Sequence, residues 1–168
     1  MFSDVLMYEN SLKERLRDSE HLLIVGVGNE LGSDDGAGVE LSRKLKREFR
    51  GAKKVSVIEG GTTPENFTSI IRKLRPSHIL IIDAAQMGLR PGSVRIIEKG
   101  EISGFGFSTH SLPLSFLIDY LEKNSRAIVV VVGIEPLNVG FGKQLSKPVA
   151  DSIVNLVRVL RQIINQIG

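Results

Sequence analysis

The sequence predicts a three-layer α/β/α sandwich on a mainly parallel, twisted sheet of roughly five strands. Apolar runs alternate along the chain with amphipathic stretches, which is typical of strands joined by crossover helices. The runs at 22–27, 78–82 and 127–132 are apolar almost throughout, as in strands that are buried on both faces. A chain of 168 residues with 42% hydrophobic residues is also long enough for one proper core.

We expect one domain over residues 1–168, with an N-terminal helical extension at 1–20 and an α/β core at 22–164. The predicted elements are helices at about 11–18, 35–49, 63–75, 113–125 and 146–164, and strands at 22–27, 54–58, 78–82, 93–97 and 127–132.

Local signals justify the elements of the first half. The segment Ser11–Glu14 fits a capping box and starts a short helix that precedes the first strand like an appendage. Residues 54–58 alternate between apolar and polar, as in a strand. Thr63 followed by Pro64 is typical of a helix start, and Pro76 ends that helix.

Local sequence signals also predict the strands and helices of the second half of the chain. The strand at 78–82 is the most continuously apolar, which predicts a central place in the sheet. The strand at 93–97 follows a short link, which favours an antiparallel edge position. Pro113 lies in the first turn of the next helix, and Ser146 is expected to cap the last one, whose apolar residues recur at helical spacing.

Composition excludes several classes of function. The net charge of +3, 5% aromatic residues and the lack of Trp argue against a nucleic-acid partner. The absence of Cys excludes disulfides and thiolate catalysis. The longest aliphatic run, 127–132, is far too short to cross a membrane, and the acidic first twenty residues do not form a signal peptide. We therefore expect a cytoplasmic protein without membrane insertion.

The turn after the first strand is rich in glycine and also acidic. Residues 26–38 contain five glycines, of which Gly26 and Gly38 are the first and the last, and Asp34 and Asp35 lie among them. Glycine allows sharp turns and close approach of a ligand to the backbone. Adjacent carboxylates would repel a phosphate, so the turn predicts half of an acidic site that meets a cation.

Ligands of open α/β sheets bind at the carboxyl ends of the strands, and this rule sorts the remaining candidates. The residues expected at that edge are Asp34, Asp35, Glu59, Asp83, His110 and Glu135. His21 and His78 precede their strands and belong to the opposite edge. Asp35, Asp83 and His110 form a mixed oxygen and nitrogen set that suits a divalent ion such as zinc, nickel or iron.

Simpler roles compete with binding at several of these positions. Asp34 is expected to be a helix cap or turn former, and Glu59 and Glu135 are expected to bond to loops. Packing is expected for four large residues in loops: Met87, Phe105, Phe107 and Phe141.

A different class of function, a non-enzymatic Rossmann-like nucleotide-binding module, remains as the alternative. Gly26 and Gly28 after a strand resemble the start of a dinucleotide fingerprint, and Glu59 ends the second strand where a ribose-binding acid would lie. Position 31, where the third glycine should fall, is Leu31, however.

An ordered set of short blocks resembles the hydrogenase maturation endopeptidases. The blocks are Gly26–Asn29, Asp34–Gly38, Glu59–Thr62, Ile82–Ala84, Ser108–His110, Gly133–Pro136 and Leu145–Ser146. The resemblance covers about residues 22–164, and the metal-binding positions of that family fall on Asp35, Asp83 and His110. Residues 1–20 precede the usual family start, Glu135 stands where the family often has Gln, and Gln144 where it often has Gly.

The resemblance implies a cytosolic endopeptidase that removes a C-terminal extension from the large-subunit precursor of a [NiFe] hydrogenase after nickel insertion. Asp35, Asp83 and His110 would serve as both the catalytic and the metal-binding residues. They would recognise nickel carried by the precursor, and no organic cofactor is expected. Hydrolysis would proceed by metal polarisation of the carbonyl or of water, or by a carboxylate acting as general base. A metal-carrying accessory protein that docks without cutting is a further possibility.

Overall fold

The computed structural model describes residues 2–107, 113–142 and 144–167, with side chains described from Met7 onward. Its helices are α1 (Phe2–Leu16), α2 (Ala37–Glu48), α3 (Thr68–Leu74), α4 (Leu114–Ser125) and α5 (Lys147–Ile167), and three 3₁₀ helices are η1 (Ser33–Gly36), η2 (Pro64–Phe67) and η3 (Lys99–Gly104). The strands are β1 (Leu22–Val27), β2 (Val55–Gly61), β3 (His78–Gln86), β4 (Val94–Ile97), β5 (Gly106–Phe107) and β6 (Ile128–Ile134).

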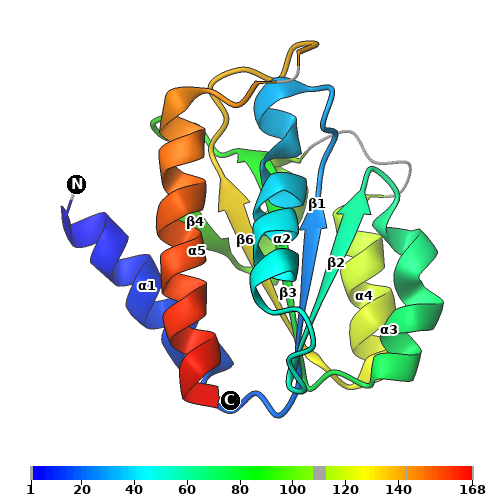
Figure 1. The fold of residues 1–168 in the computed structure, drawn as a ribbon. Helices are drawn as coiled ribbons and strands as arrows, with labels where there is room; N and C mark the ends of the chain where they lie inside the picture. Colours follow the sequence, from blue (N-terminus) through cyan, green and yellow to red (C-terminus); the bar gives the residue numbers. More distant parts are fainter. Residues whose placement is uncertain (1, 108–112, 143, 168) are drawn as a thin grey trace.

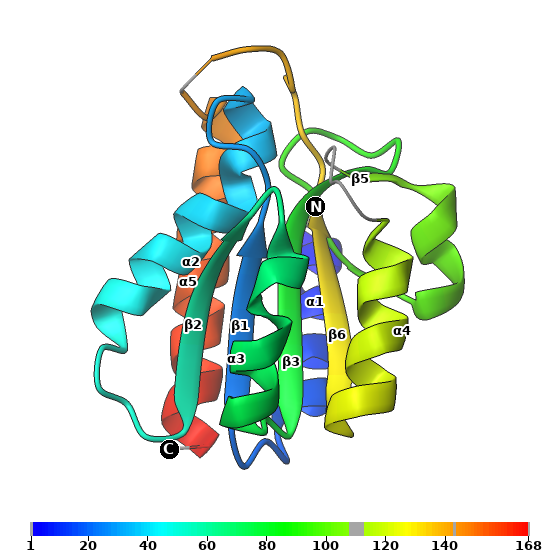
Figure 2. The ribbon, with the colours of Figure 1, turned by 90° about the vertical axis from the view of Figure 1, so that its right-hand side faces the viewer.

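The predicted sandwich is confirmed. The sheet has the order β2-β1-β3-β6-β4, with β5 paired to the end of β3. β1, β2, β3 and β6 run parallel, and β4 is antiparallel to β6 at the edge. Helices α1, α2 and α5 cover one face, and α3 and α4 cover the other (Figures 1 and 2). β3 therefore takes the central place that its apolar sequence predicts.

Two apolar clusters fill the space on either side of the sheet because successive residues of a strand face opposite sides. In β3, Leu80 and Ile82 join the cluster beneath α1, α2 and α5. Ile79, Ile81 and Ala85 join the cluster beneath α3 and α4. Asp83 continues this second alternation, so it faces the layer that contains α4.

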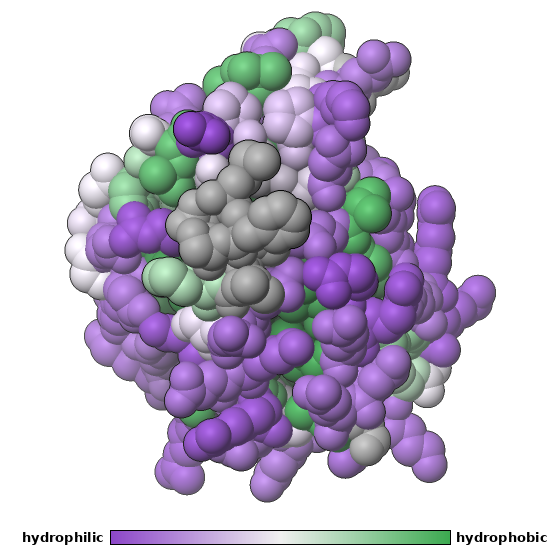
Figure 3. Space-filling view, turned by 90° about the vertical axis from the view of Figure 1, so that its left-hand side faces the viewer, coloured by the Kyte–Doolittle hydropathy of each residue, from purple (hydrophilic) through white to green (hydrophobic). Residues whose placement is uncertain are grey.

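The N-terminal helix is a structural part of the core rather than an appendage. It begins well before Ser11, and its residues Leu12 and Leu16 are fully buried in the cluster shared with α5. Tyr8 accepts a hydrogen bond from Asn155 Nδ2, and Glu9 forms an ion pair with Arg158. Burial, together with the neighbouring Glu9 carboxylate, raises the pKa of Tyr8 to about 12. The face that includes this helix is mostly hydrophilic, with small apolar patches (Figure 3).

Several predicted boundaries were too short. β2, β3 and β6 continue to Gly61, Gln86 and Ile134, because the sheet partners of β3 and β6 extend beyond the apolar runs. Asp83 thus lies within β3, paired with Gly133 of β6, rather than after the strand. The segment expected to be a plain loop after β4 contains η3 and β5, since β5 pairs with the extended end of β3.

Capping predictions also differ from the structure. Ser146 precedes α5, but its Oγ has no hydrogen-bond partner in the part of the chain that the structure describes. The side chain of Thr63 does not cap η2. The long continuous helix expected from Asp35 is a 3₁₀ turn, η1, followed by α2. No helix among the described residues is long and apolar enough to cross a membrane.

The buried histidine at the start of β3 leads to a prediction about stability. His78 is almost completely buried, and desolvation lowers the pKa of its imidazole below the ordinary 6.5. The unfolded chain therefore binds a proton more readily than the folded chain, so stability is lost as the pH falls below about 6.5. We expect the free energy of unfolding, measured in urea, to fall less between pH 7.5 and 5.5 in H78Q than in the unchanged protein. An equal fall in both proteins would contradict this account.

Candidate active site

The glycine-rich turn brings the start of α2 into direct contact with the backbone of the sheet. A side chain at Gly38 would collide with the carbonyl oxygens of Val27 and Ile82. Gly28 has φ +136°, and a Cβ there would collide with the carbonyl oxygen of Asp35. Only glycine allows this approach, and it places η1 directly against β3.

Two of the three proposed metal ligands, Asp35 and Asp83, lie on these contacting elements. Asp35 belongs to η1 and is 7% exposed, and Asp83 of β3 is fully buried. The pairing of Ile82 with Gly26 and of Asp83 with Gly133 sets Asp83 at the carboxyl ends of β1 and β6. Asp35 and Asp83, which are far apart in the sequence, thus lie on contacting elements at the edge where α/β sheets bind ligands.

The third predicted residue, His110, lies outside the described residues. The described chain resumes just before α4, and the alternation of β3 turns Asp83 toward the layer that contains α4. Among the described residues, no group of three potential metal-ligating side chains is close enough to hold an ion. Whether Asp35 and Asp83 form a metal-ligand set with a third side chain therefore depends on the position of His110.

Asp34 has a role that the sequence did not indicate. Its carboxylate does not cap a helix. Instead, Oδ2 accepts hydrogen bonds from the amides of Leu137 and Asn138 at 2.8 and 2.9 Å, and Oδ1 accepts one from Ser146 at 2.7 Å. Its own amide donates to the Asn138 carbonyl. The fully buried Asp34 therefore fastens the loop after β6 to the glycine turn.

Further bonds strengthen this connection and make the loop part of the site. The Ser33 amide donates to the Gly142 carbonyl at 2.9 Å, and the Gly142 amide donates to the Leu31 carbonyl at 2.7 Å. The Ser33 hydroxyl donates to the Gly140 carbonyl. Glu135, at the start of the loop, accepts bonds from the amides of Met87 and Leu89, which confirms its expected loop-bonding role.

The fastened loop exposes apolar side chains beside the acidic residues. The exposed fraction is 60% for Leu137, 46% for Val139 and 91% for Phe141, and nearby Leu31 is 45% exposed. The expectation that Phe141 packs into the protein is therefore wrong, whereas Met87, Phe105 and Phe107 do pack against the α3 and α4 cluster. We call Leu31, Leu137, Val139 and Phe141 the apolar rim. Hydrophobic residues within a glycine- and asparagine-containing loop were the signal that could have identified it.

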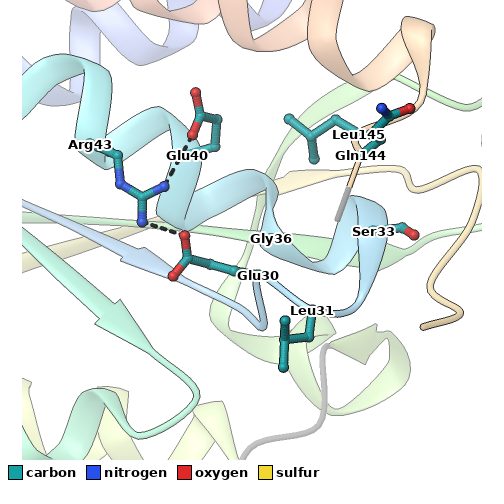
Figure 4. Close-up of a pocket in the computed structure, with 8 residues that line it drawn as sticks. All are labelled: Glu30, Leu31, Ser33, Gly36, Glu40, Arg43, Gln144 and Leu145. Atoms are coloured by element: carbon teal, nitrogen blue, oxygen red, sulfur yellow. Dashed lines mark hydrogen bonds and ion pairs between the residues drawn. The ribbon is translucent and has the colours of Figure 1, made fainter. Parts of the chain in front are cut away.

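An open hollow of about 560 Å³ lies beside η1, and we call it the rim hollow. Its lining consists of Glu30, Leu31, Ser33, Gly36, Glu40, Arg43, Gln144 and Leu145 (Figure 4). Arg43 forms ion pairs with Glu30, Glu40 and Glu59, and Glu30, followed by Glu59, raises the pKa of its guanidinium. Glu59, which was expected to bond to a loop, instead pairs with Arg43 and Lys46 of α2. Burial alone would raise its pKa, but Lys46 and Arg43 hold it below the ordinary value.

The role assigned to Asp34 predicts a large loss of stability on removal of its charge. In D34N, one carboxylate oxygen is replaced by an amide nitrogen that faces backbone N–H groups. We expect the free energy of unfolding to fall by about 2–3 kcal/mol, since hydrogen bonds to a buried charge are the strong ones. Urea denaturation measures the loss, and hydrogen exchange should become faster at Leu137 and Asn138.

The exposed Asp151 of α5 provides the matched control, because its carboxylate lies on the surface and forms an i,i+4 ion pair with Lys147. D151N should change the unfolding free energy by less than about 0.5 kcal/mol. A D34N protein as stable as D151N would show that the loop is held by other bonds.

The comparisons with known proteins agree with this architecture. Residues 39–163 match the family model described as hydrogenase maturation protease. The hydrogenase 3 maturation protease of Escherichia coli is 42% identical over 132 residues, which span 78% of this chain and 83% of that protein. A crystal structure of a hydrogenase 3 maturation protease, 39% identical, superposes with a TM-score of 0.73 over 82% of this chain and 87% of that one.

The fold itself has a still more similar counterpart. The crystal structure of a [NiFe] hydrogenase maturation protease from Thermococcus kodakarensis KOD1 has a TM-score of 0.84 over 92% of this chain and 99% of that chain. Its sequence identity is only 24%, so this likeness concerns the fold alone. The family model and the relatives above 30% identity establish the family as well as the fold. This chain belongs to the hydrogenase maturation protease family and is a peptidase.

Proposed function

We propose that this peptidase removes the C-terminal extension of a [NiFe] hydrogenase large-subunit precursor after nickel insertion. The relative from Escherichia coli that is 42% identical is named a hydrogenase 3 maturation protease, which supports a hydrogenase precursor as the substrate. The observation that carries the proposal is that Asp35 and Asp83 are both buried and belong to elements that contact each other at the carboxyl edge of the sheet. Family membership argues against the alternative of a non-enzymatic nucleotide-binding module. We also propose that the reaction takes place in the cytoplasm.

In this proposal Asp35, Asp83 and His110 bind the nickel that the precursor already holds. Two carboxylates and an imidazole suit a borderline divalent ion and leave positions for ligands from the precursor. Binding through the substrate's metal makes cleavage depend on nickel insertion, because a nickel-free precursor lacks the group that the three side chains recognise. Peptide hydrolysis then follows either from polarisation of the scissile carbonyl or water by nickel, or from a carboxylate acting as general base.

The apolar rim supplies the second support, since it forms a surface on which the precursor can dock. Exposed apolar residues that gather on one surface mark interaction sites more often than chance. Here the bonds of Asp34 and Ser33 hold the loop in place, so little conformational entropy is lost when a partner binds. The rim and the two buried acids lie at the same edge of the sheet, which supports a site where docking and chemistry occur side by side.

The decisive experiment follows the mass of the precursor. Incubation with nickel-loaded precursor should release a C-terminal peptide, whereas nickel-free precursor should stay intact. Intact-mass measurement reports both cleavage and the cut position. Equal cleavage of both forms would falsify nickel recognition, and an unchanged mass of the loaded form would leave the chain as an accessory protein that does not cut this substrate.

Substitution of each proposed ligand tests the site. D35N, D83N and H110A should each lower the rate of processing of the nickel-loaded precursor by at least about a hundredfold, since each removes one of three metal contacts. Urea unfolding of each variant checks that the fold persists, and D151N serves as the control with normal processing. Processing at the normal rate in any of the three folded variants would remove that residue from the site.

Phe141 tests the docking surface separately from the chemistry. F141S should raise KM for the precursor by about tenfold or more, because burial of a Phe side chain contributes roughly 1.5–3 kcal/mol, and should leave kcat nearly unchanged. Val154, an exposed residue of α5 with 66% of its surface accessible, provides the control V154S. If F141S and V154S behave alike, the rim does not take part in docking.

A further inference from the structure

Positive charge is concentrated on one short segment of this nearly neutral chain. Residues 43–54 contain seven cations and one carboxylate, although the whole protein has a net charge of only +3. The cations are Arg43, Lys44, Lys46, Arg47, Arg50, Lys53 and Lys54. The sequence-based argument from net charge overlooked this concentration, because acids elsewhere in the chain balance it.

Ion pairs satisfy only part of this charge. Arg43 and Lys46 both contact Glu59, and the one carboxylate within the segment, Glu48, forms an ion pair with Arg161 of α5 instead. Arg47 and Arg50 are exposed and form no ion pair with any residue that the structure describes. Two guanidinium groups therefore remain available on the surface of α2 and the turn that follows it.

These available cations line a second hollow, which we call the basic hollow. It has a volume of about 570 Å³ and is lined by Arg43, Lys46, Arg47, Arg50 and Glu59. Arg43 also lines the rim hollow, so the two hollows adjoin at this residue. Together the two hollows extend from Ser33 and Gly36 of η1, the element that contains Asp35, along α2 to Arg50, and we call this stretch of surface the path.

We propose that the basic hollow binds an acidic stretch of the precursor's C-terminal extension; this inference rests on the proposed function. The part of the precursor that holds nickel must face Asp35 and Asp83, which leaves the extension free to follow α2. From Gly36 to Arg47 the helix rises about 16 Å, the length of roughly five extended residues. The acidic stretch therefore begins about five residues beyond the cleavage site.

The local chemistry favours a polypeptide over a nucleic acid. Carboxylates of Glu30, Glu40 and Glu59 lie along the path and would repel a continuous phosphate backbone. Among the described residues that line the two hollows, none is aromatic, so no platform exists for base stacking. A peptide with a few separate carboxylates can instead place them against Arg47 and Arg50 and leave its other residues beside the acids.

Charge reversal of the two available arginines tests the proposal with the precursor that the unchanged protein cleaves. R47E/R50E should raise KM about tenfold at low ionic strength and leave kcat unchanged, since these contacts are remote from the scissile bond. The KM of the unchanged protein should rise with salt, whereas that of the variant should not. R72E/K73E, a double charge reversal on exposed residues of α3 on the opposite face, should keep the normal KM.

A reciprocal change in the substrate makes the test specific. Replacement of the acidic residues of the extension by Lys should raise KM for the unchanged protein and restore it for R47E/R50E. A normal KM for R47E/R50E, an equal effect of R72E/K73E, or an extension without acidic residues in this stretch would each overturn the proposal. These outcomes presuppose cleavage by the unchanged protein, so they are distinguishable from failure of the proposed function.

Direct binding decides between the two classes of polyanion. Fluorescence anisotropy compares a labelled eight-residue peptide of Asp, Gly and Ser with a labelled single-stranded oligonucleotide of eight nucleotides. We expect the unchanged protein to bind the peptide in a salt-sensitive manner. This binding should be lost in R47E/R50E and kept in R72E/K73E. Tighter binding of the oligonucleotide, or no binding of the peptide at low salt, would overturn the assignment.

Discussion

The close contact between the start of α2 and the backbone of β1 and β3 is the constraint on which the site depends. It requires residues without side chains, because a Cβ at Gly26 or Gly38 would occupy the space of the neighbouring backbone. The contact presses η1 against β3 and so unites Asp35 with the strand that contains Asp83. A larger residue in either position would separate the two acids by moving the helix away from the sheet.

In our proposal, the adjacent carboxylates of the turn have different roles, one structural and one chemical. Asp34 is fully buried and bonds to three backbone amides of the distant loop, so its charge is used to hold the loop. Asp35, one residue further, lies on the element that contacts β3. Successive residues of a tight helical turn point in different directions, which allows Asp34 to hold the loop while Asp35 takes the site role that we propose for it.

Substrate recognition, as we propose it, is distributed over three surfaces around one edge of the sheet. The acids meet the metal, the apolar rim meets the folded body of the precursor, and the basic hollow along α2 meets the extension. The rim is fastened by Asp34, and the two hollows adjoin at Arg43, which is itself held by three carboxylates. Elements that stabilise the loop and the helix therefore also set the relative positions of the surfaces.

Strand positions, the sheet class, the edge strand β4 and the acidic carboxyl edge could be predicted from the sequence, since they follow from local apolar patterns and from the geometry of parallel sheets. Three features were decided by tertiary contacts alone: the burial of Leu12 and Leu16, the bonds of Asp34 to residues more than a hundred positions away, and the exposure of Phe141. The length of β3 was also decided by tertiary contacts, because Ala84, Ala85 and Gln86 extend the strand by pairing with β6 and β5. A local pattern reports what a residue prefers, whereas its partners across the sheet or in a distant loop exist only once the chain has folded.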